Sequence, residues 1–151
     1  VRINLVIIVK THIMYYIKSI MKNIIFKLIE FVYYFSLLVL LILYLFPGSL
    51  IGYFLYGNLG QQPNLVTNPI GTSINHLIFF SYITIITIIV RLRVKNIFTS
   101  YKFILFIAGI LEILHLIIPN RAFELYDLIA NIAGVFIVLL INSFIKWQKY
   151  I

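Results

Sequence analysis

The sequence contains no cysteine, and only 4 of its 151 residues are acidic. Without cysteine there is no disulfide, no thiolate metal site and no cysteine nucleophile. Charged residues make up 11% of the chain, well below the level of a soluble domain. In their place, 63% of the residues are hydrophobic and the mean hydropathy is +1.09. A soluble protein of this size has too little interior to bury so many apolar side chains. The composition therefore predicts a membrane protein with a single domain.

Four apolar stretches are long enough to cross a bilayer. About 20 apolar residues in a helix cover the hydrocarbon layer, and a helix pairs its own backbone groups in lipid. None of the stretches alternates polar and apolar residues as a barrel strand does. We expect an all-α polytopic membrane protein in which four transmembrane helices form an antiparallel bundle. The expected spans are residues 28–46, about 74–90, about 101–118 and about 126–145.

The basic residues indicate the orientation of these spans, because Lys and Arg are retained on the cytoplasmic side. All of the 12 Lys and Arg except Arg121 precede the first span, lie around the loop between the second and third, or follow the fourth. We therefore expect an inner-membrane protein with both termini in the cytoplasm. The net charge of +8 is then a topology signal, and no nucleic-acid partner is expected.

Residues 1–27 have two interpretations. Apolar residues at helical spacing, with lysines between them, are typical of a basic amphipathic helix on the inner leaflet. Alternatively the start is misassigned, and Met14 or Met21 begins the protein. In both cases residues 28–151 are the transmembrane domain. A loop of turns is expected at residues 53–72, which contain two prolines and three glycines.

Polar residues inside the spans mark a candidate site, because an ionisable group costs about 2.5–3.5 kcal/mol inside a membrane helix. Glu112 and His115 are three residues apart and share one helix face. Asp127 and Asn131 share a face of the last span, and His76 opens the second. We expect a ligand-binding site in the outer half of the membrane, formed by His76, Glu112, His115, Arg121, Asp127 and Asn131.

Most of these residues also have an ordinary structural explanation. Asp127 suits a helix start, Asn131 can bond to a neighbouring helix, and Arg121 can pair with Glu124 or a headgroup. Glu112 is the hardest to explain in this way, because it lies well inside its span. No cofactor is expected, and di-iron bundles need two Glu-x-x-His pairs where this chain has one. A single metal ion held by His76, Glu112 and His115 is left as an alternative.

The stretch 112–134 resembles the signature of the VanZ-like family. Six of its residues match that pattern in order and spacing, namely Glu112, Pro119, Arg121, Asp127, Asn131 and Gly134. His76 and Tyr82 resemble the opening of an earlier helix in the family, and the likeness covers roughly residues 30–145. His115 stands where the family usually has Gln, and Thr72 and Ser73 stand where it has Asp and Lys. The resemblance implies a four-helix bacterial inner-membrane protein, and the family has no established mechanism.

Three functions are compatible with these residues. The first is a module that binds an anionic or lipid-linked cell-envelope molecule, with Arg121 donating to its phosphate or carboxylate. The second is a structural or assembly subunit whose polar residues only hold the helices together. The third is a membrane enzyme in which Glu112 is the general base and His76 or His115 the acid. Membrane lipid is the expected partner, and the oligomeric state is not predicted.

Overall fold

The computed structural model describes residues 2–61 and 71–149, apart from the side chains of residues 2–11, 13, 71 and 72. Within these residues the chain is entirely helical, with five helices and no strand, which confirms the all-α prediction. The helices are α1 (Arg2–Leu45), α2 (Leu50–Tyr56), α3 (Gly71–Arg91), α4 (Tyr101–Leu114) and α5 (Leu125–Gln148).

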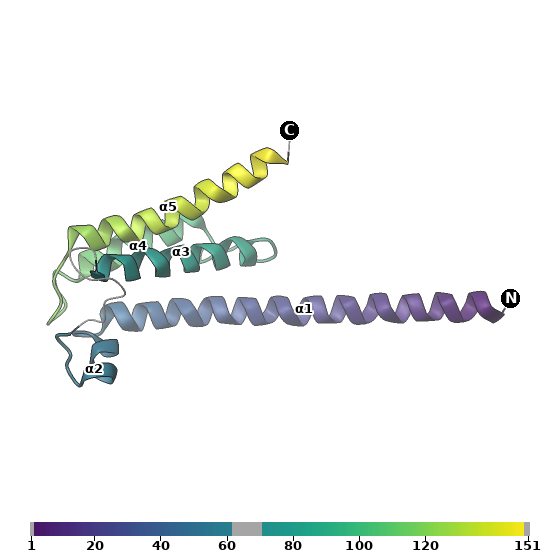
Figure 1. The fold of residues 1–151 in the computed structure, drawn as a ribbon, viewed down its shortest axis with the longest axis horizontal. Helices are drawn as coiled ribbons and strands as arrows, with labels where there is room; N and C mark the ends of the chain where they lie inside the picture. The colour runs from purple at the N-terminus through teal and green to yellow at the C-terminus, as the bar shows by residue number, and fades with distance from the viewer. Residues whose placement is uncertain (1, 62–70, 150–151) are drawn as a thin grey trace.

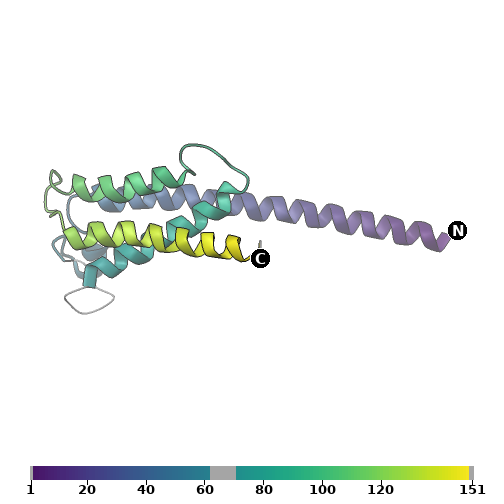
Figure 2. The same ribbon diagram turned by 90° about the horizontal axis from the view of Figure 1, so that it is seen from above.

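Helices α3, α4 and α5 and the C-terminal half of α1 lie side by side (Figures 1 and 2). The most extensive contact joins α3 to α5, and α4 packs on α5 while α1 packs on α3. The C-terminal ends of α1 and α4 and the N-terminal ends of α3 and α5 meet at one end of the bundle, at the left in Figure 1. We call this the site end. Both chain termini lie in the opposite direction.

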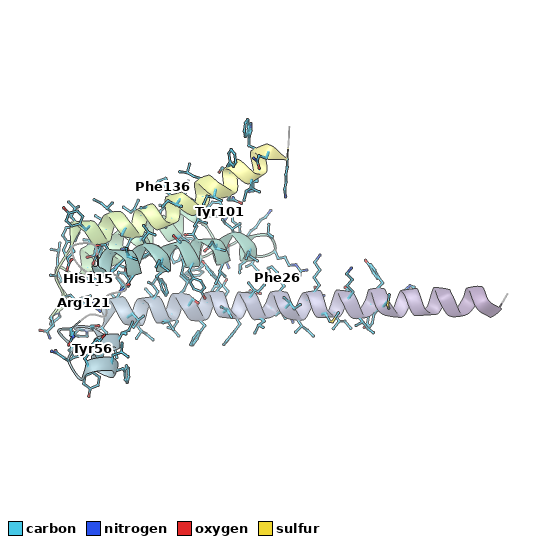
Figure 3. All side chains as sticks on the ribbon, in the orientation of Figure 1. Phe26, Tyr56, Tyr101, His115, Arg121 and Phe136 are labelled. Atoms are coloured by element: carbon cyan, nitrogen blue, oxygen red, sulfur yellow. The ribbon has the colours of Figure 1, made fainter. Side chains whose placement is uncertain are left out.

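Three helices are long and apolar enough to cross a membrane, and their candidate spans are Met14–Leu45, Ser73–Arg91 and Leu125–Gln148. Large apolar side chains also cover the outward faces of the bundle (Figure 3), and Phe31, Phe106 and Leu140 are each more than 60% exposed. A helix that is apolar on its outer face as well as its inner face is typical of lipid surroundings. The chain is therefore a multi-pass membrane protein.

Helix α4 is shorter than the expected third span. It ends at Leu114 rather than near residue 118, so its 14 residues measure about 21 Å. The N–H groups of His115, Leu116 and Ile117 bond three residues back, at 3.0–3.1 Å, which tightens the chain into turns. Pro119 follows, and a proline disfavours helical backbone in the residue before it.

The structure also describes the two flanks of the first expected span. Helix α1 continues unbroken through residues 27 and 28, so the N-terminal segment and the first span belong to one helix. The expected loop at residues 53–72 overlaps a short helix, α2, and the prediction of turns was wrong for its first residues. Ser49 caps α2 by accepting from the Gly52 N–H at 2.9 Å, and Gly57 ends it with a φ of 68°. Residues 62–70 of the loop lie outside the described residues.

Gly134 sets the close approach of α5 to α3. A Cβ at this position would lie 2.5 Å from the carbonyl oxygen of Leu77, a backbone atom that cannot rotate away. The glycine therefore allows the two backbones to touch, as small residues do in membrane helix packing. Beside this contact the core is apolar and includes Leu40, Phe80, Ile83, Ile104, Leu111 and Val135.

The loop between α3 and α4 is bonded to the middle of α1. The Tyr33 hydroxyl donates to the Phe98 carbonyl at 2.5 Å, and the Asn96 side-chain amide donates to the Tyr34 hydroxyl at 3.0 Å. About three turns nearer the N-terminus of α1, the Arg93 guanidinium donates to the Asn23 side chain at 3.0 Å. These bonds fix α1 against the end of the bundle that is opposite the site end.

Candidate functional site

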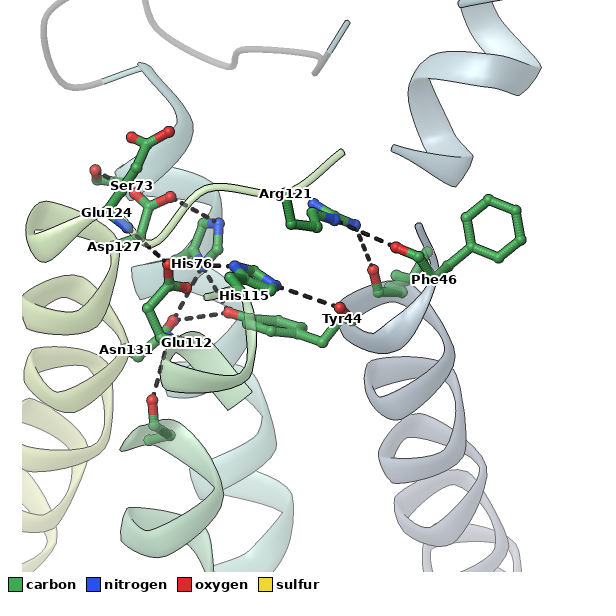
Figure 4. A network of polar contacts seen from close by, with 12 residues as sticks. Tyr44, Phe46, Ser73, His76, Glu112, His115, Arg121, Glu124, Asp127 and Asn131 are labelled. Atoms are coloured by element: carbon green, nitrogen blue, oxygen red, sulfur yellow. Dashed lines mark hydrogen bonds and ion pairs between the residues drawn. The ribbon is translucent and has the colours of Figure 1, made fainter. Parts of the chain in front are cut away.

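Four helices bring a polar cluster together at the site end (Figure 4). We use the name polar cluster for Tyr44, His76, Glu112, His115, Asp127 and Asn131. The helices carry these residues to one level because α1 and α4 end there and α3 and α5 begin there. Glu112 and Asn131 are fully buried, and Asp127 and His115 are almost so. Five of the six residues expected from the sequence thus lie in one group, although their binding of a ligand stays a prediction.

Tyr44, His76 and Asn131 form a triangle of hydrogen-bonding groups. The Asn131 amide nitrogen donates to the Ala108 carbonyl at 3.2 Å, so the amide oxygen faces the other two residues. The Tyr44 hydroxyl donates to that oxygen at 2.9 Å. Its own oxygen lies 2.6 Å from His76 Nδ1 and, having spent its proton on Asn131, must accept from it. The network therefore places a hydrogen on Nδ1 of His76.

Asp127 contacts two side chains of α3. Its Oδ1 accepts from the Ser73 hydroxyl at 2.5 Å, and its Oδ2 lies 3.3 Å from Nε2 of His76. Ser73 stands where the VanZ-like pattern has a lysine, and it contributes a neutral donor. Asp127 also begins α5, where a carboxylate is favoured by the helix dipole.

Only one of the two carboxylate oxygens of Glu112 has hydrogen-bond partners among the described residues. Its Oε1 accepts from the Glu124 N–H at 3.1 Å and lies 3.2 Å from His115 Nδ1. The other histidine nitrogen, Nε2, lies 3.3 Å from the Tyr44 carbonyl oxygen, so both nitrogens face acceptors. The second carboxylate oxygen of Glu112, Oε2, is buried and has no hydrogen-bond partner among the described residues. A buried acceptor left unpaired costs about 1–3 kcal/mol or more.

Arg121 lies beside the polar cluster and binds α1. Its Nη2 donates to the Leu43 carbonyl at 2.6 Å and its Nε to the Phe46 carbonyl at 3.3 Å. These are carbonyls at the end of α1, which have no partner within the helix. In the described part of the chain Arg121 forms no ion pair with Asp127 or Glu124. Partial burial lowers the pKa of Arg121, yet a guanidinium stays charged in proteins.

Glu124 lies between Arg121 and the start of α5 and is exposed to solvent. Partial loss of hydration and the nearby Asp127 carboxylate raise the pKa of Glu124. Its side chain is not part of the cluster, and its contribution is the backbone N–H that binds Glu112.

A cavity of about 140 Å³ opens next to the cluster, between the end of α1, α2 and α3. Three of the expected site residues line it, namely His76, His115 and Arg121. Glu112, Asp127 and Asn131 are not among its lining residues. Its remaining walls are mainly apolar and come from Leu40, Leu43, Tyr44, Ser49, Leu50, Ile51, Asn75 and Phe79. His115 and Arg121 lie at the same end of the molecule as α2 (Figure 3).

Sequence reasoning missed Tyr44, which bonds directly to two site residues. The available signal was its position near the C-terminal end of the first expected span, at the level of the other polar groups. A tyrosine at the end of a span is also typical of the aromatic belt at a membrane interface, so its position alone does not mark a site. Ser73 was noticed only as a departure from the family pattern, whereas it binds Asp127 directly.

A scan against protein-family models, a search of curated proteins and a search of solved structures each found no match. The resemblance to the VanZ-like family therefore stays a prediction from the residues that carry it.

Proposed function

We propose that this chain is a four-span protein of the bacterial inner membrane that binds the anionic headgroup of a lipid or lipid-linked envelope molecule at the outer face. Both termini would lie in the cytoplasm, as the distribution of Lys and Arg indicates. Helix α4 and the apolar turns that follow it would form the remaining span. The VanZ-like pattern around Glu112 and Asp127 supports an envelope role.

The observation that carries the proposal is the position of Arg121 in the wall of an otherwise mainly apolar cavity. Two of its nitrogens are bonded to carbonyls of α1, which fixes the plane of the guanidinium. Its third nitrogen, Nη1, makes no hydrogen bond to a described residue, and the side chain is half-buried. A fixed guanidinium with a free donor is suited to a phosphate or carboxylate.

The rest of the cavity fits the other properties of such a ligand. His76 and His115 add polar groups near the headgroup position, and Leu50, Ile51 and Phe79 offer an apolar wall. The volume of about 140 Å³ suits a headgroup rather than a whole lipid. The hydrocarbon chain would then lie along the apolar outer faces of the bundle, where the membrane itself is.

Binding of a polyprenyl phosphate to the purified protein, followed by native mass spectrometry, tests the proposal. We expect Arg121→Lys to weaken binding about tenfold or more, because a point charge does not reproduce the planar guanidinium. The lysine can still donate to the Leu43 carbonyl, so the variant should fold.

Arg93→Lys, at the opposite end of the bundle, is the matched control and should bind normally. Inorganic phosphate is added as a competitor, because it competes for recognition of the headgroup but not for recognition of the hydrocarbon chain. Equal binding by Arg121→Lys and the native protein would refute the proposal.

The alternative of a purely structural subunit is favoured by one observation, the hydrogen bonds that join α1, α3, α4 and α5 through Tyr44, His76, Ala108 and Asn131. Under that alternative, each variant of the cluster or of Arg121 should change binding only in proportion to the folded protein that is lost. Measuring binding per folded molecule therefore separates the two functions.

A further inference from the structure

Three side chains from three different helices point to a metal site within the polar cluster. His76 of α3, Glu112 of α4 and Asp127 of α5 each offer one ligand atom, and these atoms all lie within 4.8 Å of one another. We propose that they bind one divalent first-row transition metal ion. This site shares His76 with the cavity of the proposed lipid binding, whereas Glu112 and Asp127 do not line that cavity.

The first supporting observation is the unpaired oxygen of Glu112. Its side chain is fully buried, and Oε2 has no partner among the described residues while Oε1 has two. Buried polar atoms in native proteins are almost always satisfied, and each exception needs an explanation such as an ion. A cation beside Oε2 would supply the missing partner.

The second observation is the way in which His76 faces Asp127. The bonds of Tyr44 and Asn131 place the ring hydrogen on Nδ1, so a neutral His76 turns the lone pair of Nε2 toward Asp127 Oδ2 at 3.3 Å. Two electron pairs at this distance repel unless a cation lies between or beside them. Two ligand atoms that are each about 2.1 Å from a tetrahedral metal ion are about 3.4 Å apart. The observed separation matches that requirement.

The ligand set indicates the class of metal. One imidazole nitrogen with two carboxylate oxygens suits Zn²⁺, Fe²⁺ or Mn²⁺. Mg²⁺ keeps several of its waters and prefers oxygen ligands only, so this largely buried site disfavours it. The two carboxylates carry a formal charge of −2, which a divalent ion neutralises. Three protein ligands leave a further coordination position open.

The neighbours of the three ligands hold them as the partners of metal ligands usually do. Ser73 binds Oδ1 of Asp127, which leaves Oδ2 for the ion, and the Glu124 N–H binds Oε1 of Glu112, which leaves Oε2. The Nδ1 hydrogen of His76 has acceptors at Tyr44 and Asn131. Such partners orient the ligands, and losing one commonly weakens metal binding about 10–100-fold. The metal site considered from the sequence consisted of His76, Glu112 and His115. In the site proposed here, Asp127 takes the place of His115.

Metal binding by the tag-free protein in detergent tests the inference directly. The protein is stripped with chelator and dialysed against ZnCl₂, and bound zinc is measured by mass spectrometry. We expect one zinc per chain, a zinc-dependent rise in Tm, and visible Co²⁺ absorption typical of a low-coordinate site. His76→Gln, Glu112→Gln and Asp127→Asn should each weaken binding about tenfold or more, and Ser73→Ala should weaken it about tenfold.

Two controls keep the result specific. His12→Gln, on the exposed face of α1 far from the cluster, should bind zinc as the native protein does. His115→Gln replaces a hydrogen-bonding partner of Glu112 and not a ligand, so it should weaken zinc binding less than Asp127→Asn does. Circular dichroism establishes that each variant is helical before its binding is scored.

Three results would overturn the site. If the native protein binds no zinc at micromolar free metal, that result alone refutes the site, whatever the variants do. The contact between His76 and Asp127 would then be explained by a shared proton. Equal zinc binding by His76→Gln and Asp127→Asn would show adventitious metal. A loss with His115→Gln as large as that with Asp127→Asn would favour the other set of ligands. Lipid binding through Arg121 is measured separately, so failure of one proposal leaves the other standing.

Discussion

The Tyr44 hydroxyl donates to the Asn131 side chain at 2.9 Å and thereby links α1 to α5. These two helices have little other direct contact, since α1 packs on α3 and α4 while α5 packs on the same pair from the other side. The bond crosses the centre of the site end, where Tyr44 also stacks on His115 with ring centroids 5.3 Å apart. One tyrosine therefore connects all the helices that carry the polar cluster.

Tyr44→Phe is expected to lower the free energy of unfolding by about 1 kcal/mol. The change removes the hydroxyl that Asn131 and His76 share, but these two still approach each other at 3.1 Å, so the loss is moderate, as for other hydrogen bonds between membrane helices. Thermal unfolding in detergent followed by circular dichroism measures it. Tyr126→Phe, whose side chain is exposed, is the control and should be neutral. An unchanged Tm for Tyr44→Phe would contradict the bonding scheme.

Gly134→Ala should destabilise the protein by about 1–3 kcal/mol, as overpacking does. The new methyl group would meet the Leu77 carbonyl oxygen at 2.5 Å and force α5 away from α3. Gly109→Ala is the matched control, because a Cβ there meets nothing within 4 Å and alanine favours helix. We expect its Tm to stay level or rise. Equal losses in the two variants would mean that helix propensity, and not close packing, governs both positions.

Arg121→Ala and Asp127→Ala should have independent effects on stability. Arg121 bonds to carbonyls at the end of α1, whereas Asp127 bonds to Ser73 and contacts His76, so the two share no partner. We expect the double variant to lose the sum of the single losses to within about 0.5 kcal/mol. Urea or detergent unfolding of the four proteins forms the cycle. Recovery of stability in the double variant would instead reveal an ion pair between the two residues.

Single cysteines can be placed without background, since the chain has none. Ala122→Cys, in the exposed turn between α4 and α5, should react with an impermeant maleimide on intact cells. Lys95→Cys, in the exposed loop between α3 and α4, should react only after the membrane is opened. Labelling of both positions from the same side would require an even number of crossings between them and contradict the proposal that α4 and the turns after it form one span.

Long apolar runs were enough to predict an all-helical membrane protein, because their length and hydropathy are local properties. The ends of helices were harder. Leu114 ends α4 because the turns after it and Pro119 act together, and α2 forms because Ser49 and Gly57 cap it at both ends. Each of these depends on a few backbone bonds that apolar periodicity does not reveal.

The polar cluster could be anticipated because ionisable residues inside a membrane helix are costly and therefore conspicuous. Which of these residues contact one another could not be predicted from the sequence. His76 lies 3.3 Å from Asp127, and Arg121 bonds to the end of α1 and not to Asp127. Pairing depends on the rotation of each helix about its axis, which Gly134 sets by packing against α3 and not against α4. A single tyrosine in an aromatic-rich chain gave no comparable signal.

Helix α1 is attached to the bundle at two levels, by Arg121 at its C-terminal end and by the α3–α4 loop at Tyr33 and Tyr34. A sliding movement of α1 along its axis would have to break both attachments together, so the two attachments hold α1 in its register along the bundle. Helix α2 is different, because it packs mainly on the turn that follows it, with the Ser49 N–H bonded to the Leu59 carbonyl. The cavity wall at Leu50 and Ile51 therefore belongs to an element that is anchored apart from the four longer helices, so substitutions in α2 should alter the cavity with little effect on the stability of the bundle.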